Sequence, residues 1–264
     1  MSNIFICYAD NRFKESQNRL AKQAQKVGIF DKIIKYTPKD LPSYITSSPL
    51  FAFSKGGGYW VWKPYIIYYT LLESNNGDIV WYCDSGCTLD ASSSEWNYFQ
   101  EQMKVHSSIF FQYRKDFDYG WNAEIRHWIK LSSIDYFSQY IDKSFLSYGK
   151  ILAGFMIFRK TNKIPEILDQ WYKISLFHPE LVADPFGAEL KKLPPDFCAH
   201  RHDQSILTPL VYHFKDADNV LVLPETSESH IGKPAVLATR WRLGKMSCWQ
   251  KLKYTVWRII HNEK

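Results

Sequence analysis

The sequence predicts an α/β protein with a mixed, mainly parallel β-sheet flanked by helices in a single domain. Two observations support this prediction. Short apolar runs typical of buried strands alternate along the chain with segments in which apolar residues recur at helical spacing. The length of 264 residues and the 45% content of hydrophobic residues allow one large core, and neither a repeat nor a low-complexity linker divides the chain.

Six apolar runs are expected to form the strands. The first, NIFICY, is short and continuously apolar except at its start, as a buried strand would be. The third follows the turn signal Asn76-Gly77. The predicted strands cover residues 3–8, 32–36, 78–83, 108–113, 151–158 and 220–223.

Helices are expected between these strands. Leu20, Ala24 and Val27 recur at helical spacing after the first strand, and Pro64 suits the first position of a helix, where no backbone N–H is needed. Further helices are predicted at residues 64–73, 94–104, 121–131, 164–175 and 204–214.

Composition argues against several classes of protein. No window reaches the roughly 18 to 20 uninterrupted apolar residues of a membrane-spanning helix. The start MSNIFICYADNRFK has no basic segment or small-residue cleavage site, so we do not expect export through a secretory signal. Five scattered cysteines do not suggest a disulfide framework. These features predict a cytoplasmic protein.

The net charge of +6 lies in the C-terminal tail. From Arg240 onward there are seven of the 33 Lys and Arg residues and one of the 27 Asp and Glu residues, which leaves 26 of each sign in residues 1–239. A nucleic-acid-binding domain normally spreads its basic excess over one face, so a neutral body argues against a nucleic-acid partner. We therefore separate a domain at residues 1–239 from a basic tail at 240–264.

The tail is predicted to form an amphipathic helix. At about 100° per residue, Trp249, Leu252 and Val256 fall on one face, with Lys251 and Arg258 opposite. Such a helix can lie on an anionic membrane surface, where each Lys or Arg contributes about 1 kcal/mol, or pack as a terminal helix on the domain. We expect the first, which would hold the protein peripherally at the inner face of the cytoplasmic membrane.

A glycine triplet at residues 56–58 precedes the helix predicted at Pro64. Backbone amides of such a loop can approach phosphate, and a helix N-terminus favours anions. The triplet matches neither the dinucleotide motif nor the P-loop, and a plain surface loop explains it equally well. Tyr59 and Trp60 follow it and are candidates for stacking on a nucleotide base or a sugar face.

A buried strand delivers Asp84 at its carboxyl end, within the run WYCDSGC at residues 81–87. Ligands of open α/β sheets bind at that edge. Taken alone, Asp84 could equally cap the next turn.

Three stretches, in this order, resemble nucleotide-sugar glycosyltransferases of the GT-A fold. The strand ending in Asp84 resembles the one that carries the family's Asp-x-Asp. Residues 153–157 (AGFMI) resemble the Asn-Ala-Gly-hydrophobic strand of the glycogenin-like sugar transferases, and residues 202–207 (HDQSIL) resemble their Asp-Gln-x-hydrophobic-Leu helix start. The run GGYWVWKPY at 57–65, with YCDSGC at 82–87, is closer still to bacterial glycosyltransferases of capsule and lipopolysaccharide O-antigen clusters.

The resemblance covers residues 3 to about 235 and implies a single GT-A-like (Rossmann-like) domain. It implies that Asp84 and Asp203 are the catalytic residues. The implied donor-binding residues are Tyr59, Trp60, Lys63, Asp84, Ser85, Gly86, Gly154 and Lys233.

One departure from the family concerns the metal. Its Asp-x-Asp holds a divalent cation and the donor diphosphate, whereas the second carboxylate is here replaced by Gly86. Asp84 and His230, the latter in a segment HIGKP similar to the family's His-x-Gly-x-x-Lys-Pro, are the candidate ligands for Mn²⁺ or Mg²⁺. The sequence leaves metal dependence open. Without a metal, a basic side chain has to neutralise the leaving diphosphate, and the candidates are Lys63, Lys233 and Arg240.

Asp203 stands at a predicted helix start, where an N-cap contributes about 1 kcal/mol. Its carboxylate could instead orient or deprotonate an acceptor hydroxyl, or face the anomeric carbon in a retaining reaction. Four polar residues are candidates for binding the acceptor or phosphate, although a solvated helix face explains the first two equally well: Arg126, Lys130, His202 and Gln204.

These motifs predict an enzyme, a hexosyltransferase. It would move a hexose from a UDP-sugar to a glycan or lipid-linked oligosaccharide acceptor in capsule or lipopolysaccharide O-antigen synthesis. The alternative is a catalytically inactive nucleotide-sugar-binding or assembly module, which the missing carboxylate at Gly86 favours.

Overall fold

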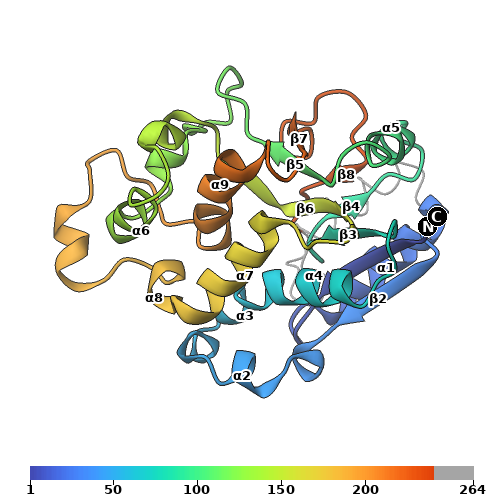
Figure 1. Ribbon diagram of the computed structural model, residues 1–264, viewed down its shortest axis with the longest axis horizontal. Coiled ribbons are helices and arrows are strands. Elements are labelled where there is room, and N and C mark those ends of the chain that lie inside the picture. The colour runs from blue at the N-terminus through green and yellow to red at the C-terminus, as the bar shows by residue number, and fades with distance from the viewer. Residues whose placement is uncertain (241–264) are drawn as a thin grey trace, which may run out of the picture.

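The computed structural model describes residues 1–240 and confirms the α/β class, with a mixed six-stranded sheet between two layers of helices (Figure 1). The strand order is β2-β1-β3-β6-β5-β7. Three of the five strand pairs are parallel, and β6 runs antiparallel to both of its neighbours. The strands are β1 (Asn3–Tyr8), β2 (Lys32–Tyr36), β3 (Ile79–Cys83), β5 (Ser108–Gln112), β6 (Ile151–Arg159) and β7 (Val220–Pro224). Every predicted strand is present, and its bounds agree within one residue.

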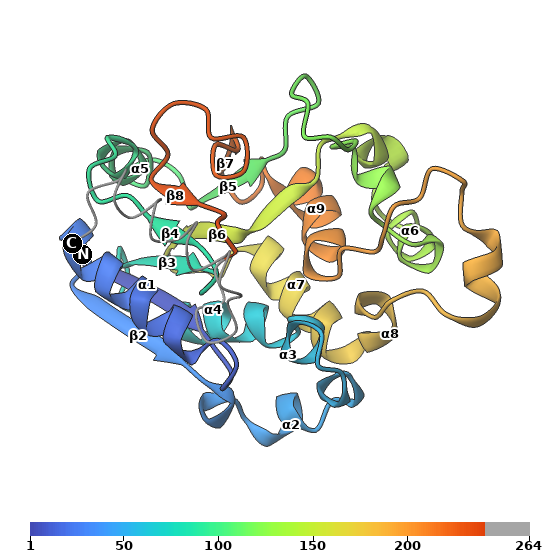
Figure 2. The same cartoon turned by 180° about the vertical axis from the view of Figure 1, so that it is seen from behind.

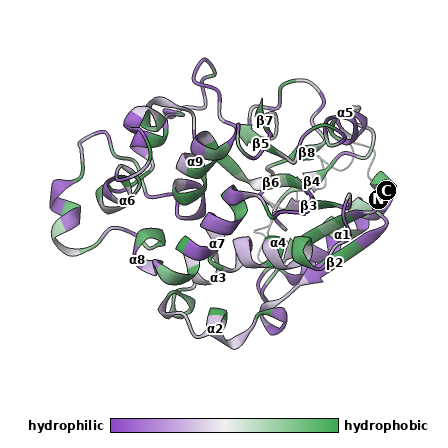
Figure 3. Cartoon of the chain, viewed as in Figure 1, coloured by the Kyte–Doolittle hydropathy of each residue, from purple (hydrophilic) through white to green (hydrophobic). Residues whose placement is uncertain are grey.

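Each face of the sheet is covered because buried side chains alternate along the strands. Ile4 and Ile6 of β1 join the core under α4, α7 and α9, whereas Phe5 and Cys7 face the opposite core, which includes residues of α1 and α5. Figures 1 and 2 show the two helical layers from opposite sides, and Figure 3 shows the hydrophobic colouring of the strands between them. The helices are α1 (Lys14–Val27), α2 (Ser43–Thr46), α3 (Gly56–Tyr59), α4 (Trp62–Leu72), α5 (Glu95–Gln102), α6 (Leu131–Phe137), α7 (Glu166–Phe177), α8 (Pro179–Val182) and α9 (Asp203–Phe214).

The strand directions bring several connections to one edge of the sheet. Because β1, β3, β5 and β7 run the same way, their carboxyl ends meet at this edge, which we call the carboxyl edge. Asp84 directly follows β3, and the antiparallel β6 enters the sheet from the same edge. A small second sheet of β4 (Thr88–Leu89) and β8 (Val236–Leu237) follows Asp84 in the chain and ties the described C-terminal segment to it.

The helix predicted at residues 121–131 is wrong. This segment forms a single 3-10 turn at Ile125–His127, and α6 begins only at Leu131. Its backbone hydrogen bonds go to the approach to β6 instead of to its own next turn. The N–H of Ile125 donates to Tyr148 O at 2.9 Å, and the N–H of Lys150 donates to Ala123 O at 2.9 Å. The apolar residues of this segment have helical spacing, but they are buried in a loop that is hydrogen-bonded to the approach to β6.

The glycine triplet forms part of a left-handed turn. Five consecutive residues, 56–60, have positive φ, and the last two, Tyr59 (φ 52°) and Trp60 (φ 60°), are not glycine. Left-handed backbone costs a residue with a Cβ about 1–2 kcal/mol, so the surrounding contacts must hold this turn. Helix α4 starts directly after it at Trp62, which makes Pro64 its third residue and not its first.

The predicted amphipathic helix of the tail lies outside the described residues, apart from Arg240. Within residues 1–240, no helix is long and apolar enough to cross a membrane.

Candidate active site

Asp84 lies at the carboxyl edge against the middle of β6. Its N–H donates to Gly154 O at 2.8 Å, which continues the β3–β6 ladder by one residue. A Cβ on Gly154 would lie 3.5 Å from Asp84 Oδ2, an ordinary contact, so the carboxylate rests directly on this glycine. The structure thus brings the first two motifs of the resemblance together.

Lys63 of α4 joins Asp84 to Asp203, the first residue of α9. Its Nζ lies 3.2 Å from Asp84 Oδ1, 2.5 Å from Asp203 Oδ2 and 3.0 Å from Ala153 O. The Lys63 side chain is 1% exposed, whereas Asp84 keeps 35% exposure and therefore presents part of its carboxylate to solvent. We call Lys63, Asp84 and Asp203 the bridged cluster.

The opposite charges in the bridged cluster counteract the effect of burial on the pKa values of Lys63 and Asp84. Burial acts to lower the pKa of Lys63, but the carboxylates of Asp203 and Asp84 outweigh it and raise that pKa. Burial raises the pKa of Asp84, and the Lys63 ammonium opposes this shift. Removing Lys63 would leave two carboxylates facing each other without their cation.

Tyr82 is a member of this site that the sequence did not single out. Its hydroxyl donates to Asp84 Oδ1, and burial followed by the Asp84 charge raises the pKa of Tyr82 well above its usual value. Tyr82 therefore stays a hydrogen-bond donor that orients the carboxylate. The sequence could have indicated Tyr82, because it is two residues before Asp84 and residues two apart on a strand point to the same face.

The left-handed turn positions Lys63 through aromatic contacts on both of its sides. The indole N–H of Trp62 donates to Gly56 O at 2.9 Å, and its ring stacks on Tyr8 with centroids 3.7 Å apart. Trp60 lies on the other side, stacked on His202 at 5.6 Å. Because these contacts fix both ends of the turn, the start of α4 is held against β1 and α9.

Asp184, which the sequence did not indicate, ties the turn to the connection before α9. It accepts a hydrogen bond from the Tyr59 hydroxyl at 3.0 Å and pairs with the Lys55 ammonium at 3.1 Å. His202 Nε2 lies 3.5 Å from it, while His202 Nδ1 lies 2.9 Å from Val182 O. Burial lowers the pKa of His202 to about 4, so this histidine is neutral at pH 7.

Asp203 is the first residue of α9 and not its N-cap, which is His202. Its Oδ1 accepts the N–H of Gln204 at 3.0 Å at the start of α9, while Oδ2 holds Lys63. The preceding His202 has φ 48° and ψ −110°, an unusual backbone for a residue with a Cβ. This bend directs Asp203 into the bridged cluster.

Several other candidate residues lie away from the bridged cluster or serve the fold. Arg126 is exposed and pairs with Glu124 at 2.6 Å, and the buried Lys130 donates to Glu180 O at 2.5 Å. Arg126 and Lys130 do not share a helix, because the helix predicted at residues 121–131 is absent. The Ser85 hydroxyl donates to the carbonyl at the end of β1 at 2.6 Å. Lys233 is exposed on the connection between β7 and β8.

The described residues do not fit a divalent-cation site. Asp84 is a single carboxylate whose Oδ1 already receives the Tyr82 hydroxyl and lies beside the Lys63 ammonium. His230 is exposed and forms no hydrogen bond or ion pair with Asp84. Within residues 1–240, no three His, Cys, Asp or Glu side chains gather to hold a metal ion. The Arg240 backbone lies next to Gly86, since a Cβ on Gly86 would lie 3.5 Å from Arg240 Cα, an ordinary contact.

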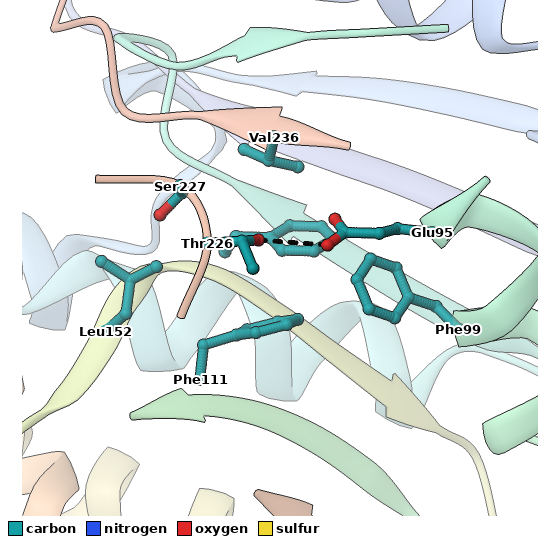
Figure 4. A pocket seen from close by; sticks show the side chains of 8 residues that line it. Glu95, Phe99, Phe111, Leu152, Thr226, Ser227 and Val236 are labelled. Carbon is teal, nitrogen blue, oxygen red and sulfur yellow. Dashed lines mark hydrogen bonds between the residues drawn. The ribbon is translucent and has the colours of Figure 1, made fainter. Parts of the chain in front are cut away.

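A cavity of about 10 Å³ lies on the side of the sheet covered by α5 (Figure 4). It is lined mainly by Phe99, Phe111 and Phe155, and the Thr226 hydroxyl, 3.2 Å from Glu95 Oε1, borders it. This volume suffices for about one water molecule, so it is too small for a sugar or a nucleotide.

No family model and no curated protein sequence matches this chain. Solved structures of glycosyltransferases are similar to it at low identity. The chain aligns over 97% of its length with the whole of a glycosyltransferase that acts in glycosylation of the major capsid of PBCV-1, at 8% identity and a TM-score of 0.49. It aligns over its full length with 63% of the glycosyltransferase GlyE of Streptococcus pneumoniae TIGR4, at 12% identity and 0.42. Mouse xyloside xylosyltransferase 1 matches at 8% identity, 86% of each chain and 0.44.

Proposed function

We propose that this protein is a glycosyltransferase of the GT-A type that moves a hexose from a UDP-sugar to a glycan acceptor. The observation that carries the proposal is the bridged cluster. Lys63, Asp84 and Asp203 come from three separate motifs of the sequence resemblance, and they meet at one point of the carboxyl edge. Ligand sites of open α/β sheets lie at this edge.

In this proposal Asp84 faces the donor and the Lys63 ammonium fixes its orientation. A leaving diphosphate gains negative charge, which requires cationic groups near Asp84. Arg240 lies next to Gly86, and it pairs with Glu228 at 2.7 Å. We assign Arg240, together with Lys233, to the diphosphate.

Asp203 would act on the sugar side of the donor. Its Oδ2 is held by Lys63, so its carboxylate is fixed beside Asp84. A fixed carboxylate can orient an acceptor hydroxyl or stabilise positive charge at the anomeric carbon.

Donor turnover separates this proposal from an inactive nucleotide-sugar-binding or assembly module. Release of UDP is measured for a panel of UDP-hexoses with glycan acceptors, for the wild type, Asp203→Asn and the surface control Asp216→Asn. We expect Asp203→Asn to lower turnover roughly 100-fold or more, with Asp216→Asn unchanged. If the wild type binds UDP-sugars but releases no UDP with any of them, the inactive module is correct.

The same assay tests metal dependence. Because the described donor set does not fit a divalent cation, we expect turnover to persist in excess EDTA and to fall when Arg240 is replaced by Ala. Complete loss in EDTA, with recovery on adding Mn²⁺ or Mg²⁺, would mean that Asp84 gains metal ligands that the described residues do not supply.

The biological setting that we propose is capsule or lipopolysaccharide O-antigen synthesis with a lipid-linked acceptor. It is supported by the sequence runs at residues 57–65 and 82–87 and by the basic tail. Peripheral binding of the tail to the inner face of the cytoplasmic membrane would bring the carboxyl edge close to such an acceptor.

A further inference from the structure

The amine of Lys150 lies inside a box of three aromatic rings. Its Nζ is 3.9 Å from the ring centroid of Tyr113, 3.3 Å from that of Trp121 and 4.6 Å from that of Trp128. Lys150 is 1% exposed, and its Nζ has no hydrogen-bond partner among residues 1–240. The three aromatic faces are therefore the close neighbours of this amine, and burial lowers its pKa to about 6.

Arg201 also lies over the ring of Trp128. Its guanidinium carbon lies 4.6 Å from the Trp128 centroid. Its buried Nε has no acceptor, and the guanidinium forms no ion pair within the described chain. An arginine presents five N–H groups in a fork that fits carboxylate or phosphate, and among residues 1–240 no side chain accepts a hydrogen bond from this fork.

The nearby carboxylates do not fill this need, because their hydrogen bonds are made elsewhere. Glu225 accepts the Tyr119 hydroxyl at 2.5 Å and the N–H of Glu228 at 2.8 Å. Glu228 in turn accepts the Tyr113 hydroxyl at 2.7 Å and pairs with Arg240 at 2.7 Å. The donors that stay unmatched are the Lys150 amine and the Arg201 guanidinium, and the guanidinium carries the positive charge that an anion would pair with.

The box adjoins the bridged cluster but does not coincide with it. Lys150 directly precedes β6 at the carboxyl edge, four residues before Gly154, which is about 13 Å at the rise of a strand. Arg201 stands two residues before Asp203. The distance places Lys150 outside the bridged cluster.

Half-buried aromatic rings continue the box toward solvent. Tyr119 stacks on Trp121 with centroids 4.7 Å apart, and Phe117 lies 4.6 Å from Tyr119. These rings and Trp121 are partly exposed. The apolar face of a pyranose ring packs on such aromatic surfaces, so the patch offers a sugar platform beside a cationic fork.

We propose that Arg201, supported by Lys150 and the aromatic box, binds an anionic group, carboxylate or phosphate, on a sugar unit of the acceptor. That the bound sugar is an acceptor rests on the proposed glycosyl transfer, whereas the binding of an anionic sugar at Arg201 does not. An anion at Arg201 would pair with the unmatched guanidinium, and the sugar ring would lie against the half-buried rings of Phe117 and Tyr119.

Saturation-transfer NMR and titration with three small glycosides test this proposal directly. The probes are methyl glucuronide, the neutral methyl glucoside, and glucose 6-phosphate. We expect one or both anionic sugars to bind roughly tenfold more tightly than the glucoside, a difference of about 1.4 kcal/mol. Binding of glucuronide alone indicates a carboxylate site, and binding of the phosphate alone indicates a phosphate site. Equal binding of all three, or binding of none, would overturn the proposal.

Variants place the binding on Arg201. Arg201→Ala should remove the preference for the anionic sugar, while Lys173→Ala, which removes an exposed cation paired with Asp169 on α7, should keep it. The comparison of glucuronide with glucoside on wild-type protein needs no variant, so it decides the question even if Arg201→Ala does not fold. UDP titration on the same samples separates the two proposals: a wild type that binds glucuronide but not UDP refutes the transferase assignment alone.

Discussion

Lys63 Nζ lies 2.5 Å from Oδ2 of Asp203, a residue 140 positions further along the chain. The contact joins the start of α4 to the start of α9 across the carboxyl end of β3. Lys63 reaches Asp84 from the same position. One buried ammonium therefore fixes the geometry of two carboxylates, and the stability of the site and its proposed chemistry depend on the same side chain.

Replacing Lys63 by Ala should destabilise the protein and abolish donor turnover. The change leaves the buried Asp203 and the partly exposed Asp84 without their cation, which costs about 3 kcal/mol of the free energy of unfolding. Urea unfolding measures this loss. Lys55→Ala is the matched control, since the side chains of Lys55 and Asp184 are 49% and 43% exposed and their pair contributes at most about 1 kcal/mol. Equal losses for both variants would contradict the role of Lys63.

Two glycines with the same backbone angle separate the effect of strain from that of crowding. Gly58 (φ 93°) and Gly77 (φ 92°) both occupy the region that favours glycine. A Cβ on Gly58 would lie 3.2 Å from Phe51 Cα, whereas a Cβ on Gly77 meets nothing within 4 Å. We expect Gly77→Ala to cost about 1–3 kcal/mol with turnover retained. Gly58→Ala should cost more and lower turnover, because it displaces the turn that positions Lys63. Turnover lost equally in both variants would argue against this positioning.

The regular elements could be predicted from the sequence because their apolar runs have a clear period. All six strands of the large sheet agree with the prediction. Four of them are buried almost throughout, as NIFICY shows, whereas β2 and β7 at the sheet edges are half-exposed. Asp84 was placed correctly at the carboxyl end of its strand. Position after a strand is a local property, so the sequence is sufficient to find it.

What could not be predicted depends on contacts between distant segments. Trp121 and Trp128 have helical spacing, yet Glu124 pairs with Gly149 and ties their segment to the approach to β6. Lys63 was predicted to touch donor phosphate, but its ammonium is 1% exposed and already paired with two carboxylates. Neither fact has a local sequence signal, because each depends on a partner remote in the chain.

The stability of the protein should depend on pH through Lys150. Burial lowers the pKa of this amine to about 6 from its ordinary 10.5. At a pH between these two values the unfolded chain binds a proton at Lys150 that the folded chain does not. Lys150 therefore destabilises the folded protein less as the pH rises. Lys150→Met should therefore gain more free energy of unfolding over the wild type at pH 7 than at pH 10. Urea unfolding at both values, with the exposed Lys143→Met as control, checks this. A gain that is independent of pH would show that the amine keeps its proton in the box.

The basic tail should carry membrane binding. Each Lys or Arg near an anionic leaflet contributes about 1 kcal/mol, and the tail holds the whole net charge. Vesicle co-sedimentation should show more protein bound to anionic than to neutral vesicles, and removal of the segment after Gly244 should abolish the difference while the domain stays folded. Equal binding to both kinds of vesicle would mean that the tail does not act through charge.

A crystal structure of the protein with UDP tests the central claim most directly, namely that the bridged cluster is the core of a nucleotide-sugar site. We predict UDP at the carboxyl ends of β1 and β3, with its diphosphate within one water molecule or one ion of the Asp84 carboxylate. UDP bound away from Asp84, or no UDP bound at saturating concentration, would contradict the account.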